Sequence, residues 1–168
     1  TNQPAGAVTL DDFKLVGELS GEQATFTLTA TARVEDRKGG SLELLSGGVA
    51  LTDVPTHPQW RVRVEQGRYV AVFDHAGKFP LKLRCSAAVR QSEPWKTVEF
   101  HVAPSLLQPI VLQGLGADAQ FEFAGAARPE RKGSDFTSYL PSDGTVKLAW
   151  KEARAEAEGK LFYAAEML

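Results

Sequence analysis

Residues 24–34 read Ala-Thr-Phe-Thr-Leu-Thr-Ala-Thr-Ala-Arg-Val, with an apolar side chain at every second position. Successive side chains of a β-strand point to opposite faces of the sheet, so this order produces one buried face and one solvated face. The intervening threonines favour a strand on their own account. The segment therefore predicts a half-buried strand in a protein built from β-sheets.

Similar alternation, broken by turn residues, recurs along most of the chain. The further predicted strands are residues 8–19, 41–45, 49–54, 59–65, 68–74, 78–90, 96–102, 110–113, 120–124, 135–140 and 145–151. Gln66-Gly67 and Asp143-Gly144 stand between neighbouring runs, and such pairs are typical of hairpin turns. The pattern predicts an all-β fold, an antiparallel β-sandwich that could reach a super-sandwich of about twelve strands.

The ends of the chain differ from its centre. We expect a polar N-terminal tail over residues 1–7, a sandwich domain over residues 8–151, and a charged linker with an apolar C-terminal segment over residues 152–168. Prolines near residues 103–109 mark a corner and an alternative sub-boundary, because proline cannot donate to a central ladder. The C-terminal segment fits either a short amphipathic helix or the first strand of a further module, and we favour the strand.

Composition excludes two classes of partner. The chain has 168 residues, a formal net charge of -2 and a sequence pI near 5.9. A nucleic-acid-binding surface normally brings a basic excess, so we expect no nucleic-acid partner. No apolar run approaches the roughly 20 residues of a spanning helix, so we expect no membrane insertion. The polar start, without an apolar leader, predicts a mature or trimmed chain that lacks its signal peptide.

Several landmarks between Trp60 and Trp150 resemble those of a known group of proteins. They are a strand with a tryptophan, a Gly-Arg-Tyr hairpin, Ala76-Gly77-Lys78 before a long strand, Thr97-Val98-Glu99-Phe100 before a proline corner, and the segment PSDGTVKLAW over residues 141–150. This order resembles uncharacterised β-sandwich modules of large bacterial cell-envelope proteins. The resemblance implies an exported, non-catalytic module that recurs in tandem beside membrane segments, and it supplies no catalytic or binding residue.

Metal ligation and thiol chemistry find little support. Zinc sites need three or four ligands, usually including a closely spaced pair. The three histidines, His57, His75 and His101, are dispersed, so we expect no metal site. The single cysteine, Cys85, lies on the inward face of its predicted strand, where a buried and unreactive thiol is expected.

Carboxylates and serines also point to structure and not to catalysis. Ser134-Asp135 and Ser142-Asp143 are typical of turns, because Ser and Asp side chains bond to nearby backbone amides. Asp11-Asp12 fits a turn or a solvated strand edge, and nothing marks Glu93 as a catalytic acid. No Gly-x-Ser-x-Gly motif is present, so we expect no catalytic residue.

Two loop-like segments carry possible ligand signals. Residues 114–119 match a dinucleotide-binding pattern, but that pattern must open a helix, and a strand is predicted to follow. We therefore expect no cofactor. Residues 128–133 are rich in basic side chains and predict an exposed loop, which an anionic polysaccharide or lipid head group could contact.

Exposed aromatic rings are the remaining candidates for a contact surface. Trp60 and Trp150 share a strand face with apolar residues and are expected in the core. Trp95 and Tyr139 fall on the opposite side of their strands from the apolar residues. We therefore predict that Trp95 and Tyr139 contribute to a contact surface, with rings capping the end of a sandwich as the structural alternative.

The sequence therefore predicts a non-enzymatic structural or protein-interaction module of a larger exported bacterial protein, located in the periplasm or outside the cell. Its partners would be another protein or neighbouring modules of the same polypeptide, with a polysaccharide as a further possibility. Two alternatives stay open: a carbohydrate-binding module, and a hydrolase whose site is assembled only by the fold. Residues 161–168 are expected to pair with another chain or to pack on the body.

Overall fold

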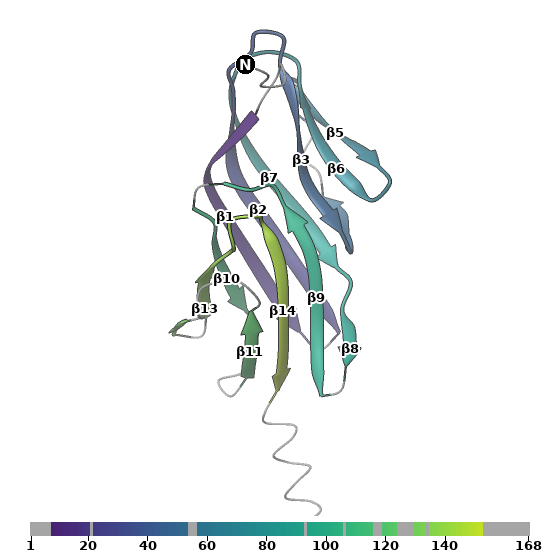
Figure 1. Cartoon of the computed structure of the whole chain (residues 1–168), viewed down its shortest axis with the longest axis vertical. Coiled ribbons are helices and arrows are strands. Elements are labelled where there is room, and N and C mark those ends of the chain that lie inside the picture. Colours follow the sequence, from purple (N-terminus) through teal and green to yellow (C-terminus); the bar gives the residue numbers. More distant parts are fainter. Residues whose placement is uncertain are drawn as a thin grey trace, which may run out of the picture.

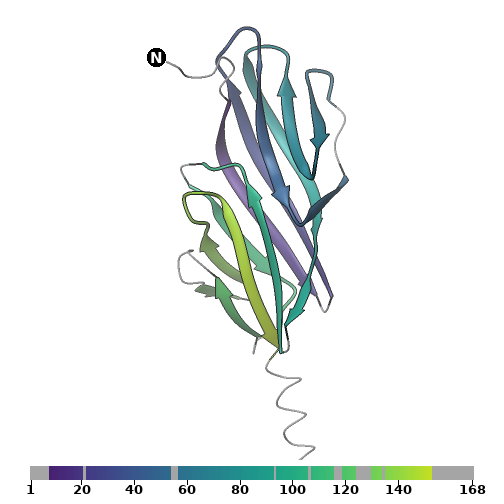
Figure 2. The ribbon, with the colours of Figure 1, turned by 45° about the vertical axis from the view of Figure 1, so that its right-hand side comes forward.

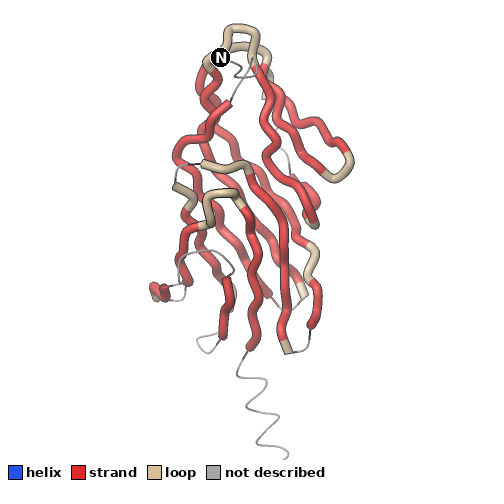
Figure 3. The backbone as a smooth tube through the Cα atoms, viewed as in Figure 1, coloured by secondary structure: helices blue, strands red, loops and turns tan. Residues whose placement is uncertain are grey.

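The structure is a computed structural model that describes residues 8–20, 22–53, 57–92, 94–105, 107–115, 119–123, 130–133 and 135–152. Its strands are β1 (Val8–Ser20), β2 (Gln23–Val34), β3 (Gly40–Gly47), β4 (Val49–Asp53), β5 (Trp60–Glu65), β6 (Arg68–Phe73), β7 (Gly77–Ala87), β8 (Arg90–Ser92), β9 (Trp95–Val102), β10 (Pro109–Gln113), β11 (Ala119–Phe123), β12 (Glu130–Lys132), β13 (Asp135–Tyr139) and β14 (Thr145–Glu152). The described ranges contain strands, turns and loops but no helix (Figure 3). The predicted all-β class is confirmed.

The strands form two layers (Figures 1 and 2). The first, sheet A, has the order β12-β13-β10-β1-β2-β7-β4. The second, sheet B, has the order β11-β14-β9-β3-β6-β5, and β8 pairs with β9 outside this path. Every paired strand is antiparallel to its neighbour except β1 and β10, which run parallel with Leu15 opposite Ile110. The predicted sandwich is therefore confirmed, with fourteen described strands and one parallel pair.

Strand β2 buries its apolar face in the core, as its alternation predicts. It lies between β1 and β7, and its apolar side chains from Ala24 to Val34 are buried while its threonines are half-buried. The Phe26 ring meets Phe100 of sheet B, with 4.9 Å between the ring centroids. Trp60 and Trp150 are buried as expected, with 4% and 0% of their surfaces exposed.

The predicted hairpin around Gln66-Gly67 is confirmed. Strands β5 and β6 pair from Trp60 opposite Phe73 to Glu65 opposite Arg68, which leaves a two-residue turn. Gln66 and Gly67 both have positive φ values, 47° and 78°. Two such residues are what a type I′ turn requires, because its twist matches that of the flanking strands.

The hairpin predicted around Asp143-Gly144 is wrong. Strand β13 belongs to sheet A and β14 to sheet B, where β14 pairs with β9. Residues 141–144 do form a tight turn, since the Gly144 N–H donates to the Pro141 carbonyl at 3.0 Å. The turn carries the chain from sheet A to sheet B. Val146 and Leu148, which follow it, are therefore buried in the core from the side of sheet B.

The single strand predicted over residues 78–90 is divided. Strand β7 ends in sheet A at Ala87, and β8 begins in sheet B at Arg90. The chain from β3 to β4 crosses in the other direction at Gly48, and the Ala88 N–H donates to the Gly48 carbonyl at 2.8 Å. The two crossings therefore brace each other at one place between the layers.

The structure also tests two smaller predictions. Asp11 and Asp12 lie within β1, at a bulge between Asp11 and Lys14 where Asp12 has a φ of 53°. They are therefore not in a turn, but they do lie on a solvated strand edge, because β10 pairs with β1 only from Leu15 onward. In the basic segment predicted as a loop, residues 130–132 form strand β12 on the edge of sheet A, with exposed side chains.

Both predicted terminal parts, residues 1–7 and 153–168, lie outside the described residues. Strand β14 runs to Glu152. Within the described part of the chain, no helix has the length and apolar character needed to cross a membrane.

Candidate functional site

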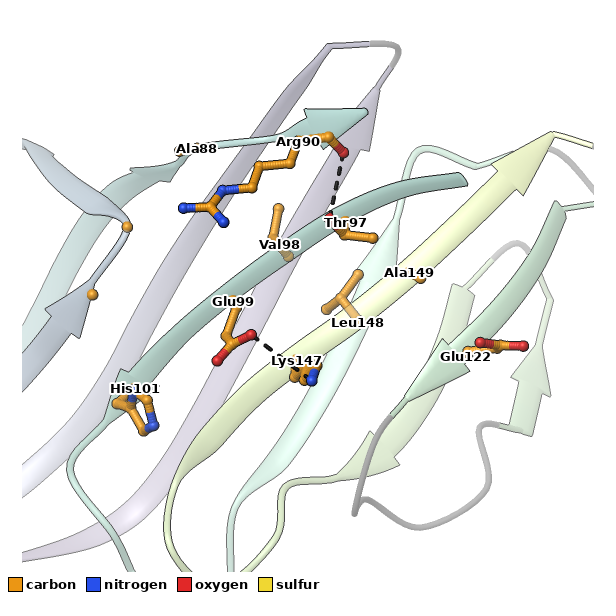
Figure 4. Close-up of a pocket in the computed structure, with 12 residues that line it drawn as sticks. Ala88, Arg90, Thr97, Val98, Glu99, His101, Glu122, Lys147, Leu148 and Ala149 are labelled. Atoms are coloured by element: carbon orange, nitrogen blue, oxygen red, sulfur yellow. Dashed lines mark hydrogen bonds and ion pairs between the residues drawn. The ribbon is translucent and has the colours of Figure 1, made fainter. Parts of the chain in front are cut away.

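Four residues on neighbouring strands of sheet B form one cross-strand row. Arg90 of β8 lies opposite Thr97 of β9, Thr97 opposite Ala149 of β14, and Ala149 opposite Glu122 of β11. The row thus begins with a cation, passes over two small residues and ends with a carboxylate. All four line one hollow on the solvent side of the sheet (Figure 4).

We name this hollow the β9–β14 trough. Its volume is about 560 Å³, and it is partly open to solvent. Thr97 and Ala149 form its floor, because their side chains are shorter than those of the residues around them. The hollow therefore follows from two small residues meeting on adjacent central strands.

A change of partner along one side of β9 extends the trough. Strand β3 pairs with β9 from Val102 to Phe100, where β3 ends at Gly47. Strand β8 pairs with β9 only from Thr97 to Trp95. Between these two partners, Val98 and Glu99 have no strand beside them on this side among the described residues.

Glycine keeps this gap open. A Cβ atom added to Gly48 would lie 3.6 Å from the Glu99 carbonyl oxygen and 3.7 Å from the Ala88 Cβ, which are ordinary contact distances. A larger side chain at Gly48 could be accommodated, but it would occupy space that the trough now uses. Gly47, Gly48 and Ala88 therefore form a low, uncharged end wall.

One long side of the trough is formed by a pair of side chains that face each other across β9 and β14, Glu99 and Lys147, with the Lys147 Nζ atom 4.0 Å from Oε1 of Glu99. A second pair, Trp95 of β9 and Lys151 of β14, lies outside the lining of the trough. In this pair the Lys151 Nζ atom lies 4.9 Å from the centroid of the Trp95 ring. The first pair neutralises its own charges, and in the second the indole face lies against an ammonium group.

The two ends of the row carry opposite charges. Among the described residues, neither Arg90 nor Glu122 forms an ion pair, and both are exposed. The Arg90 backbone is held in place, because its carbonyl accepts a hydrogen bond from Thr97 Oγ1 at 3.4 Å. Both side chains are therefore available to a bound molecule.

The two predicted contact residues lie on different layers. Trp95 is half-buried on β9, on the same face of the sheet as the trough but outside its lining. Tyr139 is 53% exposed and belongs to β13 of sheet A, whereas the trough lies on sheet B. The fold does not bring these two rings together. Whether either ring contacts a ligand stays a prediction.

Sequence reasoning missed Arg90 and Glu122. Outward parity was the only available signal for Glu122, which alternates with the aromatic residues Phe121 and Phe123 in β11. Arg90 stands at the end of the single strand predicted over residues 78–90. The placement of Glu122 and Ala149 in the same row depends on the pairing of β9, β14 and β11, which no local pattern encodes.

The structure brings His57 and His75 to the same ring, that of Phe79, and places His101 elsewhere, beside the trough. His101 is exposed, as its parity predicts. His57 stacks on Trp60 with 5.8 Å between ring centroids, and His75 packs on Phe79 with 5.5 Å. No group of three His, Cys, Asp or Glu side chains suited to a metal ion occurs among the described residues.

Cys85 and Asp143 behave as structural residues. Cys85 is buried, and burial raises the pKa of its thiol to about 12, so the thiol stays protonated at neutral pH. Hydrogen bonds from the backbone and side chain of Thr145 lower the pKa of the Asp143 carboxyl. The Thr145 N–H lies 2.9 Å from Asp143 Oδ1, which is the turn chemistry expected for Ser142-Asp143.

The dinucleotide pattern is followed by a strand and not by a helix. Strand β11 begins at Ala119 and pairs with β14, while residues 116–118 lie outside the described part. A dinucleotide site of this kind uses the N-terminus of a helix to hold the pyrophosphate. The strand at Ala119 agrees with the sequence argument.

Comparison with known proteins informs the fold only. No protein-family model matches the sequence, and no curated protein matches it. Among solved structures, yeast LTA4 hydrolase is similar with a TM-score of 0.51 and 10% identity, over 86% of this chain and 29% of that chain. The M1 zinc metallopeptidase of Deinococcus radiodurans is similar with a TM-score of 0.47 and 14% identity, over 87% of this chain and 42% of that chain.

The likeness to yeast LTA4 hydrolase concerns the fold, a large β-sandwich, which in that protein occurs within a longer chain. This chain covers less than half the length of each of these proteins. At such low identity the similarity concerns the course of the backbone and carries no residue of either enzyme to this sequence.

Proposed function

We propose that this chain is a non-enzymatic interaction module that binds an extended segment of a partner protein in the β9–β14 trough. The observation that carries the proposal is the trough itself, a hollow of about 560 Å³ with a small-residue floor on the exposed face of a regular sheet. A flat, solvated sheet face would have longer side chains at Thr97 and Ala149. Hollow surfaces with a few well-placed polar groups are the usual form of binding sites.

The side chains around the trough favour binding over catalysis. A general acid or base needs a carboxyl or imidazole poised for proton transfer. Glu99 faces Lys147, and Glu122 is exposed to solvent. Among the described residues, neither carboxyl group lies in an enclosed apolar pocket of the kind that surrounds a catalytic acid.

The wider context of the module is part of the same proposal. The landmarks that resemble bacterial cell-envelope modules support an exported location, in the periplasm or outside the cell. The occurrence of a similar sandwich in the much longer yeast LTA4 hydrolase chain is consistent with a role as one part of a larger polypeptide. Neighbouring modules of that polypeptide are candidate partners.

A peptide array tests the proposal directly. The purified chain is applied to immobilised peptides of varied sequence, and the same array is probed with Ala149→Trp, which fills the floor of the trough. Thr27→Trp is the matched control, because Thr27 is also half-buried on the outward face of a central strand, but in sheet A. We expect the wild type and Thr27→Trp to bind the same peptides and Ala149→Trp to lose them.

Either of two results would overturn the proposed function. One is the absence of any peptide bound above background by the folded wild type. The other is a set of bound peptides that Ala149→Trp retains in full. Circular dichroism of each variant confirms that the sheets remain folded, so that a loss of binding is assigned to the trough.

The carbohydrate-binding alternative is favoured by one observation. Trp95 is half-buried on the same face as the trough, and exposed tryptophan rings stack on sugars. Part of the ring already faces the Lys151 ammonium, which competes with a sugar for that surface. A glycan array that shows specific binding lost in Trp95→Ala and kept in Tyr139→Ala would favour this alternative over a protein partner.

A further inference from the structure

The charges at the ends of the trough define the polarity of its ligand. Arg90 and Glu122 stand at opposite ends of one cross-strand row, and neither is in an ion pair within the described part of the chain. The charges along one side are already matched by the contact between Lys147 and Glu99. A complementary ligand therefore brings an anionic group to Arg90 and a cationic group to Glu122.

The spacing of the strands gives the separation of the two backbone positions that carry these groups. Three strand-to-strand steps separate Arg90 from Glu122. Neighbouring strands lie about 4.8 Å apart, so the two Cα atoms are separated by about 14 Å. An extended peptide advances about 3.3 Å per residue, so four residue steps cover about 13 Å.

Besides the end charges and their spacing, the alternation of side chains in an extended peptide also fits the trough. Residues i, i+2 and i+4 of such a peptide point to the same side. If residues i and i+4 meet Arg90 and Glu122, residue i+2 points at the floor formed by Thr97 and Ala149. The methyl groups of this floor, and the space above them, suit a branched apolar side chain of moderate size.

We infer that the β9–β14 trough takes an extended peptide segment with an acidic residue, an apolar residue and a basic residue at positions i, i+2 and i+4. The carboxylate pairs with Arg90, the basic group with Glu122, and the apolar side chain lies on Thr97 and Ala149. This inference rests on the proposed function and specifies its ligand. A neutral glycan would leave both end charges unmatched, and an anionic surface would be repelled by Glu122.

Four short peptides test the inference by fluorescence anisotropy. Their central sequences are Asp-Ser-Val-Ser-Lys, Lys-Ser-Val-Ser-Lys, Asp-Ser-Val-Ser-Asp and Asn-Ser-Val-Ser-Gln, each with a fluorophore on a Gly-Ser linker and with neutral, blocked termini. The wild type should bind the first peptide about fivefold to tenfold more tightly than the other three, since partly exposed charge pairs contribute modestly. Raising the salt concentration should reduce this preference.

Charge reversal at each end should change the preferred peptide in a specified way. Arg90→Glu makes both ends acidic and should prefer the peptide with two lysines, whereas Glu122→Lys makes both ends basic and should prefer the peptide with two aspartates. The double variant restores opposite ends and should regain the first peptide, which can enter with its chain direction reversed. Lys82→Glu, an exposed charge reversal on sheet A, should leave all preferences unchanged.

The outcomes separate this inference from the function on which it rests. Peptides that bind the wild type and lose binding with Ala149→Trp, but show no switch of preference in Arg90→Glu and Glu122→Lys, overturn the charge pattern and leave the trough as a binding site. Failure of the folded wild type to bind any of the four peptides also overturns the pattern. Whether the trough binds peptides at all is then decided by the array.

Discussion

The rings of Phe26 and Phe100 pack edge to face, with 4.9 Å between their centroids and 64° between their planes. Phe26 belongs to β2 in sheet A, and Phe100 belongs to β9 in sheet B. Both side chains are completely buried. The contact therefore joins the most regular strand of the sequence to the strand that carries Thr97 and Glu99 of the trough.

Shortening Phe26 should destabilise the whole sandwich. We expect Phe26→Ala to lower the free energy of unfolding by about 3–5 kcal/mol, because it removes buried surface and leaves a cavity. Phe26→Leu keeps most of the volume and should cost less than about 2 kcal/mol. Urea unfolding followed by tryptophan fluorescence measures both values, and equal costs for the two variants would contradict this account of the contact.

The crossing turn at Gly144 should tolerate no side chain. Gly144 has a φ of 76°, and an added Cβ atom would lie 2.2 Å from the Val102 carbonyl oxygen. Gly67 has a similar φ of 78°, but nothing lies within 4 Å of its added Cβ. Gly67→Ala should therefore cost only the backbone strain of about 1–2 kcal/mol, and Gly144→Ala clearly more.

Thermal and urea unfolding of the two glycine variants provide the comparison. Their backbone conformations are matched, so any difference reports the contact with Val102. A cost for Gly144→Ala no greater than that for Gly67→Ala would show that the crossing turn moves aside easily.

The Cys85 thiol should be unreactive in the folded protein. Its pKa is raised from the ordinary value of 9.0 to about 12 because the thiol is buried. At pH 8 we expect the folded chain to react with a disulfide reagent orders of magnitude more slowly than the urea-unfolded chain. Rapid reaction without unfolding would show that the strand carrying Cys85 opens locally.

The same shift makes stability depend on pH at the alkaline end. Well below pH 9 the thiol is protonated in both states and has no effect on the pH dependence. Between pH 9 and about 12 the unfolded thiol loses its proton while the folded one keeps it, so stability falls as the pH rises. Cys85→Ala should remove this part of the slope, measured by urea unfolding at several pH values.

Trp95 should account for most of the tryptophan fluorescence that solvent can reach. Trp60 and Trp150 are 4% and 0% exposed, whereas Trp95 is half-buried beside the trough. Acrylamide should therefore quench the wild type markedly and Trp95→Phe only weakly.

The stability of the fold should depend little on Trp95. An exposed cation–π contact contributes about 0.5–1 kcal/mol, so Trp95→Phe should lower the free energy of unfolding by no more than about that amount. A loss of several kcal/mol would indicate that the ring caps the core, which is the structural alternative to a contact surface.

Much of the fold could be predicted from local patterns. The alternation in residues 24–34 led directly to β2, and the Gln66-Gly67 pair led to a true hairpin. The inward side of each strand was also predictable, as Trp60, Cys85 and Trp150 show by their burial. These features depend on the two-residue period of a strand and on the φ values that a turn demands, and both act over a few residues.

The assignment of strands to the two sheets could not be predicted from the sequence. Asp143-Gly144 has the local chemistry of a hairpin turn, yet it joins β13 of sheet A to β14 of sheet B. The segment over residues 78–90 alternates without an obvious break, yet it passes from β7 to β8 at Ala88. In both places the alternation does not say which sheet the strand joins, because the strands of both sheets bury one face against the same core.

The sequence by itself determined that this protein is made of half-buried strands, because the two-residue alternation leaves one apolar side that must be covered. It also placed Trp95 on an outward face and Cys85 on an inward one. Only the tertiary structure decided that Arg90, Thr97, Ala149 and Glu122 form one row. Arg90 and Thr97 are close in the chain, but Glu122 and Ala149 come from strands far from them, and the register of those strands is set by how the whole core packs.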